Sequence, residues 1–166
     1  MTGNAGTGAG VALGRVLSSP WLGDVSWAPD CELYFPFGLP GFEAEHRMIP
    51  VEIPAQRPLV YLQSLEHESV CFLCLPVTAI DPAFEVTLSE DDKAAIQFDP
   101  GPEPVMGRDI LCLGLLVPSG STVEANLGAP IVINLHSSRG IQCVSASQSK
   151  RALRLSDTGI WELSCS

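Results

Sequence analysis

The sequence lacks any run of 18 apolar residues, the length that a membrane-spanning helix requires. It also lacks the secretory pattern of basic residues followed by an apolar stretch, because it starts with polar residues and Arg15 interrupts the weakly apolar run Val11–Leu17. Both absences predict a soluble, cytoplasmic protein with no membrane partner. The glycines near the start are spaced by two, so the third glycine of a G-x-G-x-x-G nucleotide loop is missing.

Basic clusters are scarce. The 166 residues include 19 acidic and 9 basic side chains, which gives a net charge of −10. Fifteen acids and four bases lie between Glu32 and Glu124, whereas 125–156 holds four bases and no acid. Because phosphate contacts need clustered Lys and Arg, direct nucleic-acid binding is not expected. The acidic block is either a solvated face or a face that binds a partner.

Windows long enough for a helix interior are few, because 14 prolines are spread through the chain. Short runs rich in aliphatic and aromatic residues, each closed by Pro, Gly or Ser, are typical of strands. They predict an all-β fold, a single antiparallel barrel-like domain over 21–155 with one or two short helices. Residues 1–20 are expected to be a flexible leader and 156–166 a C-terminal tail. The expected strands are Cys31–Phe37, Leu59–Gln63, Val70–Leu75, Ile110–Val117, Ile131–His136 and Ile141–Ala146.

Three local patterns refine this fold. Ser89–Gln97 is the helix candidate, in which Ser89 caps the first turn and Asp92 occupies the reciprocal capping-box position. In "GLPGF", the order Leu39-Pro40-Gly41-Phe42 predicts a type II turn, since its third residue needs a positive φ. In "NLGAPIVIN" (126–134), Asn126 and Gly128 are expected to bend the chain before Pro130 opens a strand.

Motifs for metal binding and catalysis are missing. Cys71 and Cys74 form one C-x-x-C inside an apolar run, no second C-x-x-C or H-x-x-x-H follows, and a strand would point the two sulfurs to opposite faces. We therefore expect six reduced thiols and no metal. "HSS" at 136–138 lacks the G-x-S-x-G elbow of a serine hydrolase. No catalytic residue, cofactor or metal ligand is predicted.

Four ordered segments carry a family resemblance. "FPFGLPGFE" (35–43), "YLQSLEHESVCFLCLP" (61–76), "DPAFEV" (81–86) and above all "NLGAPIVIN" (126–134), in this order and spacing, resemble the flagellar assembly factor family, FliW. The resemblance covers most of the chain, from about Trp21 to Leu155. It implies a small, cytoplasmic, β-barrel-like protein that acts by binding and not by catalysis.

The resemblance also implies two partners, flagellin and CsrA, the RNA-binding translational regulator that represses flagellin synthesis. An antagonist of CsrA would use an acidic face, for which Glu66 and Glu68 are candidates, while an amphipathic flagellin helix would need an apolar groove. Phe42 and Tyr61 are candidates for that groove, although both could equally be core residues. A small-ligand-binding barrel or an uncharacterised hydrolase on the same fold remains the alternative. The full set of partner-binding candidates is Phe42, Glu43, Tyr61, Gln63, Glu66, Glu68, Asn126 and Asn134.

Overall fold

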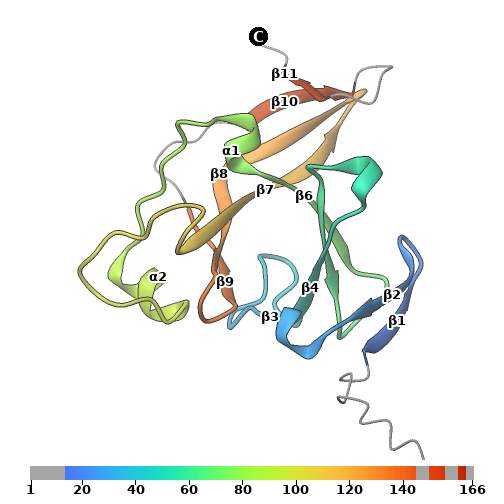
Figure 1. The fold of residues 1–166 in the computed structure, drawn as a ribbon. Coiled ribbons are helices and arrows are strands. Elements are labelled where there is room, and N and C mark those ends of the chain that lie inside the picture. Colours follow the sequence, from blue (N-terminus) through green and yellow to red (C-terminus); the bar gives the residue numbers. More distant parts are fainter. Residues whose placement is uncertain (1–13, 145–149, 156–160, 164–166) are drawn as a thin grey trace, which may run out of the picture.

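A computed structural model describes residues 14–144, 150–155 and 161–163 of the chain (Figure 1). Strands dominate this part, and the helices are short. The strands are β1 (Arg15–Ser19), β2 (Gly23–Trp27), β3 (Leu33–Tyr34), β4 (Arg47–Val51), β5 (Val60–Ser64), β6 (Cys71–Pro76), β7 (Ile110–Ser119), β8 (Thr122–Asn134), β9 (Arg139–Gln142), β10 (Lys150–Leu155) and β11 (Trp161–Leu163). The helices are α1 (Val77–Ile80) and α2 (Glu90–Ala95), with 3-10 turns η1 (Pro29–Cys31) and η2 (Pro54–Gln56).

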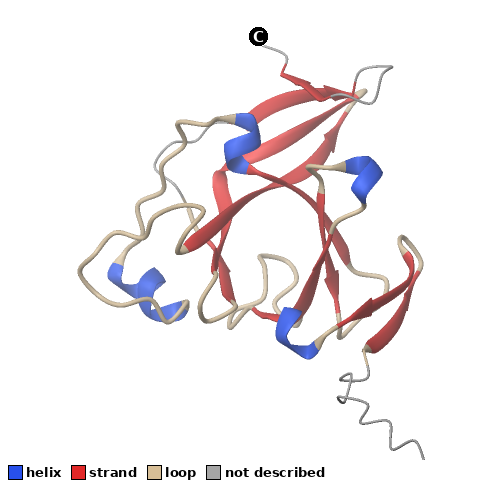
Figure 2. Ribbon diagram, in the orientation of Figure 1, coloured by secondary structure: helices blue, strands red, loops and turns tan. Residues whose placement is uncertain are grey.

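Strands β3 to β9 close into a ring. Successive strands from β3 to β8 pair antiparallel, β8 also pairs with β9, and β9 returns to β3 (Figure 2). The last junction is the one parallel pairing among the described strands, through Tyr34 and Arg139. The predicted all-β, barrel-like fold with short helices is therefore confirmed. No helix in the described part of the chain is long and apolar enough to cross a bilayer.

The barrel wall separates two apolar cores, because alternate residues of a strand point to opposite faces. On β6, Phe72 and Cys74 belong to one core and Leu75 to the other. The first core receives side chains from β3 through β8 and fills the barrel interior. The second lies outside the wall, where α1 and the segment around α2 cover strands β7 to β9. Strand β6 is therefore buried on both faces over much of its length.

Strand β8 changes faces at an irregularity. Between the pairs Leu113↔Ile131 and Leu115↔Asn126, β7 advances two positions and β8 advances five, so β8 carries three extra residues. An odd number of extra residues inverts the alternation. Accordingly Leu127 lies in the outer core and Ile131 in the barrel core. The predicted bend at Asn126 and Gly128 is thus wrong as a turn before a strand, because it is an irregularity within one long strand.

The two halves of β8, on either side of this irregularity, pair with different strands. Its first half pairs with β10, which pairs with β11, while its second half pairs with β9. Strands β7, β8, β10 and β11 thereby extend out of the barrel as a small antiparallel sheet (Figure 1). The other extension is the β1–β2 hairpin, a separate two-stranded sheet at the opposite end.

Glu32 fastens the hairpin to the barrel. Its carboxylate accepts hydrogen bonds from Arg15 (2.8 Å) and Trp27 (3.0 Å) of the hairpin and from Arg47 of β4 (2.9 Å). Burial alone would raise the pKa of Glu32, but the hydrogen bonds from Trp27 and Arg47 outweigh it and lower that pKa below its ordinary value. Glu32 is therefore ionised at neutral pH.

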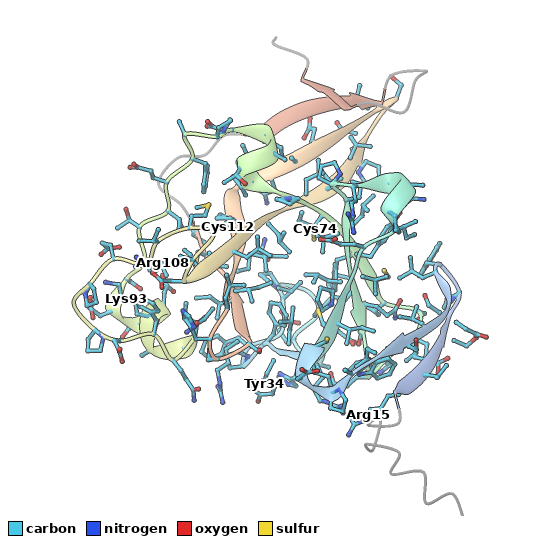
Figure 3. The ribbon with its side chains drawn as sticks, viewed as in Figure 1. Arg15, Tyr34, Cys74, Lys93, Arg108 and Cys112 are labelled. Carbon is cyan, nitrogen blue, oxygen red and sulfur yellow. The ribbon has the colours of Figure 1, made fainter. Side chains whose placement is uncertain are left out.

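The segment around α2 that covers the outer core, called the covering segment below, is held by a buried lysine. Lys93 of α2 is only 2% exposed, yet its Nζ bonds to Glu90 (3.2 Å) and Glu103 (3.1 Å). These bonds tie the loop after α2 to the helix. Farther along that loop, Asp109 accepts from Arg108 and from the amide of Val105, and Figure 3 shows Lys93 and Arg108 on the α2 side of the barrel.

The predicted helix and strands are present, but the bounds of several differ from those expected. Helix α2 begins after Ser89 and carries the predicted capping box, with both reciprocal bonds formed. The expected strand Cys31–Phe37 is reduced to two residues, and Ile141–Ala146 begins earlier, at Arg139. Residues 15–19 of the expected leader form β1, and 161–163 of the expected tail form β11. Residues 1–13 lie outside the described residues.

Candidate functional site

A groove opens where β6 and β7 separate. The two strands pair only through Cys74–Pro76 and Leu113–Leu115, although β6 begins at Cys71 and β7 continues to Ser119. The unpaired halves leave a groove of about 440 Å³ between them. Apolar side chains predominate in its lining, which comprises Phe42, Ser69, Val70, Cys71, Phe72, Leu73, Leu115, Leu116, Pro118 and Val123.

Phe42 forms one wall of this groove. The predicted turn at Leu39–Phe42 is confirmed, since Gly41 has φ of +84° and the Phe42 amide donates to the Leu39 carbonyl at 2.7 Å. The turn is anchored by Leu39, which is 2% exposed. Phe42 itself is 44% exposed and meets the ring of Phe72 edge to face, with centroids 4.9 Å apart. A rigid turn thus presents an aromatic ring at the groove.

Exposed carboxylates flank the groove. Glu43 follows Phe42, and its side chain accepts from the Gly41 amide, a bond that lowers the pKa of Glu43 below its ordinary value. Glu66 and Glu68 are exposed on the loop that joins β5 to β6, immediately before the groove residue Ser69. All three predicted acidic candidates therefore lie on the surface. Glu43 and Glu68 are chain neighbours of the groove residues Phe42 and Ser69, and Glu43 also lines a second hollow with Phe37 and Pro40.

A buried carboxylate fixes the loop that carries Glu66. Glu45 is 5% exposed; it accepts from the Ser64 hydroxyl and lies 2.6 Å from His67 Nδ1. The Ser64 oxygen in turn accepts from the amides of Glu66 (3.0 Å) and His67 (3.2 Å). In a hydrolase triad the imidazole lies between the serine and the acid, whereas here the carboxylate lies between Ser64 and the imidazole. The arrangement positions the loop and does not activate Ser64 as a nucleophile.

Gln63 does not belong to the surface, although it was a candidate. Its side chain has no exposed area and bonds entirely within the protein. It accepts from Ser19 Oγ at 2.8 Å, and its Nε2 donates to the carbonyls of Glu68 (3.0 Å) and Val70 (3.2 Å). Gln63 therefore joins the β1–β2 hairpin to the loop between β5 and β6, and the structure corrects its assignment to a partner surface.

The two asparagines also serve the fold. Asn134 is 2% exposed; it donates to the Ile96 carbonyl (2.9 Å) after α2 and accepts from the His136 amide (2.9 Å). Its assignment to a partner surface is likewise corrected. Asn126 is partly buried, and its Oδ1 accepts from the Ala129 amide at 3.2 Å across the irregularity of β8.

Tyr61 lies next to the groove but outside its lining. The side chain is half-buried and packs against the outer core, while its hydroxyl donates to Gln56. On the adjacent strand its pairing partner is Leu73, which does line the groove. Tyr61 thus supports the groove residue Leu73 from the neighbouring strand, whereas Phe42 is itself a lining residue of the groove.

The cysteines are mostly buried. The five in the described residues, Cys31, Cys71, Cys74, Cys112 and Cys143, are free. Burial raises the pKa of Cys71 to about 11, so this groove thiol is protonated at neutral pH. Within the same residues no three His, Cys, Asp or Glu side chains gather as a metal site would require. Cys165 lies outside the described residues.

The apolar residues of the groove were missed because aliphatic residues in a strand resemble core. Phe72, Leu73 and Leu115 belong to runs that we expected to be buried. The signal that could have found them is the lack of alternation in Val70–Leu75, since a run that is apolar at every position must be covered on both faces. In the structure the two cores cover the faces of β6, while β7 pairs with only part of its edge and leaves the rest of that edge facing the groove.

Comparison with known proteins identifies the family. A family model described as FliW protein matches residues 17–155, which include every residue of the groove and its acidic flanks. The chain belongs to the FliW family. Curated relatives named flagellar assembly factor FliW include those of Thermosipho africanus, 30% identical over 74% of this chain and 83% of the relative, and Desulfitobacterium hafniense, 26% identical over 77% and 82%.

A solved structure agrees with the FliW fold. The crystal structure of a flagellar assembly factor FliW superposes with a TM-score of 0.68 and 23% sequence identity, covering 82% of this chain and 92% of that one. At this identity the likeness speaks for the fold alone. The sequence resemblance drawn from the four ordered segments is confirmed by the family match.

Proposed function

We propose that this FliW-family chain is a cytoplasmic flagellar assembly factor that binds flagellin and antagonises a CsrA-type translational regulator. Family membership and the name of the curated relatives support the flagellar role. The observation that carries the binding role is the exposed apolar groove with Phe42 at its wall and carboxylates at its flanks. Such a surface suits a protein partner, because exposed apolar patches with polar rims mark interaction sites.

Flagellin is assigned to the groove. An apolar segment of flagellin would bury its surface against Phe42, Phe72 and Leu115. Burial of apolar area is the main favourable term in such contacts.

The regulator is assigned to the acidic face. Glu66 and Glu68 lie on a loop that Glu45 and Ser64 hold in place, so the backbone that carries the two carboxylates is fixed relative to the barrel. An acidic face docked beside an RNA site attracts the basic residues of the regulator and repels incoming phosphates over a Debye length of about 8 Å at physiological salt.

The test is co-purification of both partners with the protein and its variants. Glu68→Lys is the cleaner of the two acidic variants, because Glu66 also accepts a bond from the His46 amide (2.6 Å). Glu68→Lys is expected to weaken regulator binding at low salt, with a loss that shrinks as salt is raised. Glu85→Lys, the same charge change on an exposed residue of the covering segment, is the control. Equal regulator affinity in wild type and Glu68→Lys at low salt would remove this loop from the interface.

A further inference from the structure

The groove is bounded by two strand edges. Cys71, Phe72 and Leu73 of β6 pair with β5 on one side and lie beyond the last pair with β7 on the other. On the opposite bank, the β7 residues from Leu116 to Ser119 pair with β8 and with no other described strand. A gap between two strand edges is an opening in the sheet, and its backbone groups are available to a further strand.

Both sides of the gap are apolar. Phe72 and Leu115 belong to the barrel core, whereas Leu73, Leu116 and Val123 belong to the outer core. All of them line the groove, so it meets both cores. An extended segment points successive side chains to opposite faces and can fill both sides at once. A helix presents one apolar stripe and would cover one of the two sides at a time.

We infer that the groove binds its partner by strand addition: an extended segment with consecutive apolar residues enters the gap and pairs with the free edge of β6. This inference rests on the proposed function, because flagellin is the protein expected to supply the segment. It replaces the amphipathic helix expected from the sequence with a different conformation of the bound segment. The main-chain hydrogen bonds supply affinity and the two apolar walls supply specificity.

The position of Pro118 indicates which of the two strand edges the bound segment pairs with. Pro118 lies on the β7 bank and lacks the N–H group that a ladder requires, which blunts that edge. The β6 bank contains no proline between Cys71 and Leu75. Pairing is therefore assigned to β6, and the β7 bank contributes apolar contact through Leu116.

Exposed carboxylates near the groove indicate which charged residues flank the bound segment. Glu43 and Glu68 are exposed next to groove residues Phe42 and Ser69, and neither forms an ion pair with any described side chain. Among the described residues that line the groove, none is basic and could neutralise them. An apolar segment with Lys or Arg beside it would meet these carboxylates, so the occupant is a basic-flanked, extended apolar segment.

Amide hydrogen exchange in the complex with flagellin tests the inference. Alternate residues of an antiparallel strand direct their N–H groups to opposite edges, so only some of Cys71, Phe72 and Leu73 donate into the gap. Those amides should exchange at least about tenfold more slowly in the complex, as expected for newly formed hydrogen bonds. Amides of Val60 and Leu62, in the interior strand β5, are the internal control. The double variant Glu43→Lys, Glu68→Lys should weaken flagellin binding more than Glu85→Lys does.

The outcomes separate the two proposals. Flagellin that binds in a Phe42-dependent manner while the β6 amides exchange unchanged would overturn strand addition and leave the proposed function standing. Flagellin that does not bind the wild-type protein at all would overturn the proposed function. Slower exchange at the β6 amides together with weaker binding of the double variant would support the inference.

Discussion

Gly140 lies so close to Phe35 that a Cβ added to the glycine would sit 2.5 Å from Cε1 of the ring and 2.7 Å from Cζ. Gly140 belongs to β9, and the fully buried Phe35 directly follows β3. These two strands form the junction that closes the barrel. The missing side chain of Gly140 is therefore what allows the ring to fill the space under the junction.

Gly140→Ala should destabilise the fold. The ring is enclosed and cannot move aside, so overpacking is expected to cost about 1–3 kcal/mol and to lower the melting temperature by about 2–4 °C for each kcal/mol. Thermal unfolding followed by circular dichroism measures the change. Gly14→Ala is the matched control, because its added Cβ would meet nothing closer than the Trp27 carbonyl at 3.6 Å. Equal melting temperatures for the two variants would contradict the proposed close contact.

Phe42→Ala and Tyr61→Ala should differ in their effect on stability. Phe42 is substantially exposed, so its removal is expected to cost about 1 kcal/mol, mostly from the edge-to-face contact with Phe72. Tyr61 packs against the outer core, and its removal should cost about 2–3 kcal/mol. Urea unfolding gives both values. A larger loss for Phe42→Ala would show that this ring is a core residue and not a groove wall.

The contribution of Glu32 to stability should depend on pH. The pKa of Glu32 is lowered in the folded state, so its contribution is fully present above the ordinary value of 4.5 and is lost as the pH falls through the lower folded value. The stability difference between wild type and Glu32→Gln should therefore be largest near neutral pH and shrink toward about pH 3. Urea unfolding across this range measures it, and a difference that grows in acid would contradict the assigned role.

Ser89→Ala should destabilise α2. The serine oxygen accepts from the Asp92 amide at 3.0 Å, and the Asp92 carboxylate accepts from the Ser89 amide at 3.3 Å. Loss of such a cap costs about 1 kcal/mol. Thr87→Ala, an exposed position two residues earlier, is the control for loss of a hydroxyl. Hydrogen exchange at the Lys93 and Ile96 amides should quicken only in the Ser89 variant.

Thiol reactivity should follow exposure. Cys31 is exposed, whereas burial raises the pKa of Cys112 and Cys143 to about 12, and only the thiolate reacts readily. Under native conditions a disulfide reagent should modify Cys31 first among the five described thiols, and in a Cys165→Ser background Cys31→Ser should remove this fast phase. Denaturation without reductant should make all six thiols accessible to the reagent. Rapid native modification of Cys112 would show that the outer core opens more readily than its packing indicates.

The sequence predicted the strands whose signals are local. The runs that became β5, β6 and β7 are apolar and closed by turn residues, so a short window suffices to find them. Strand β4 was missed because Pro50 interrupts it, and the structure tolerates this proline with an exposed side chain. Strand β1 was missed because it follows a Gly-rich stretch that resembles a flexible leader, and β2 was missed because its sequence contains no apolar run.

The candidate site was harder to predict because burial of polar residues is decided at long range. Gln63 and Asn134 lie in family-like segments and looked like surface polar groups. Their hydrogen-bond partners Ser19 and Ile96 are 44 and 38 residues away in the chain, and no local sequence pattern predicts such bonds. The exposure of Glu43, Glu66 and Glu68 could be predicted because each lies in or beside a turn among polar residues, which is a local signal, whereas the sequence left Phe42 equally open as a core residue.

Closure of the barrel through Tyr34 and Arg139 has a consequence for synthesis. The two residues that seal the ring are 105 positions apart, and strands β4 to β8 lie between them in the chain. During translation the earlier strands can pair with their sequential neighbours, but the sheet keeps an open edge until residues 139–142 leave the ribosome. Contacts between residues so distant in the chain also slow folding. A nascent chain halted before β9 would therefore present exposed strand edges that chaperones recognise and that favour aggregation.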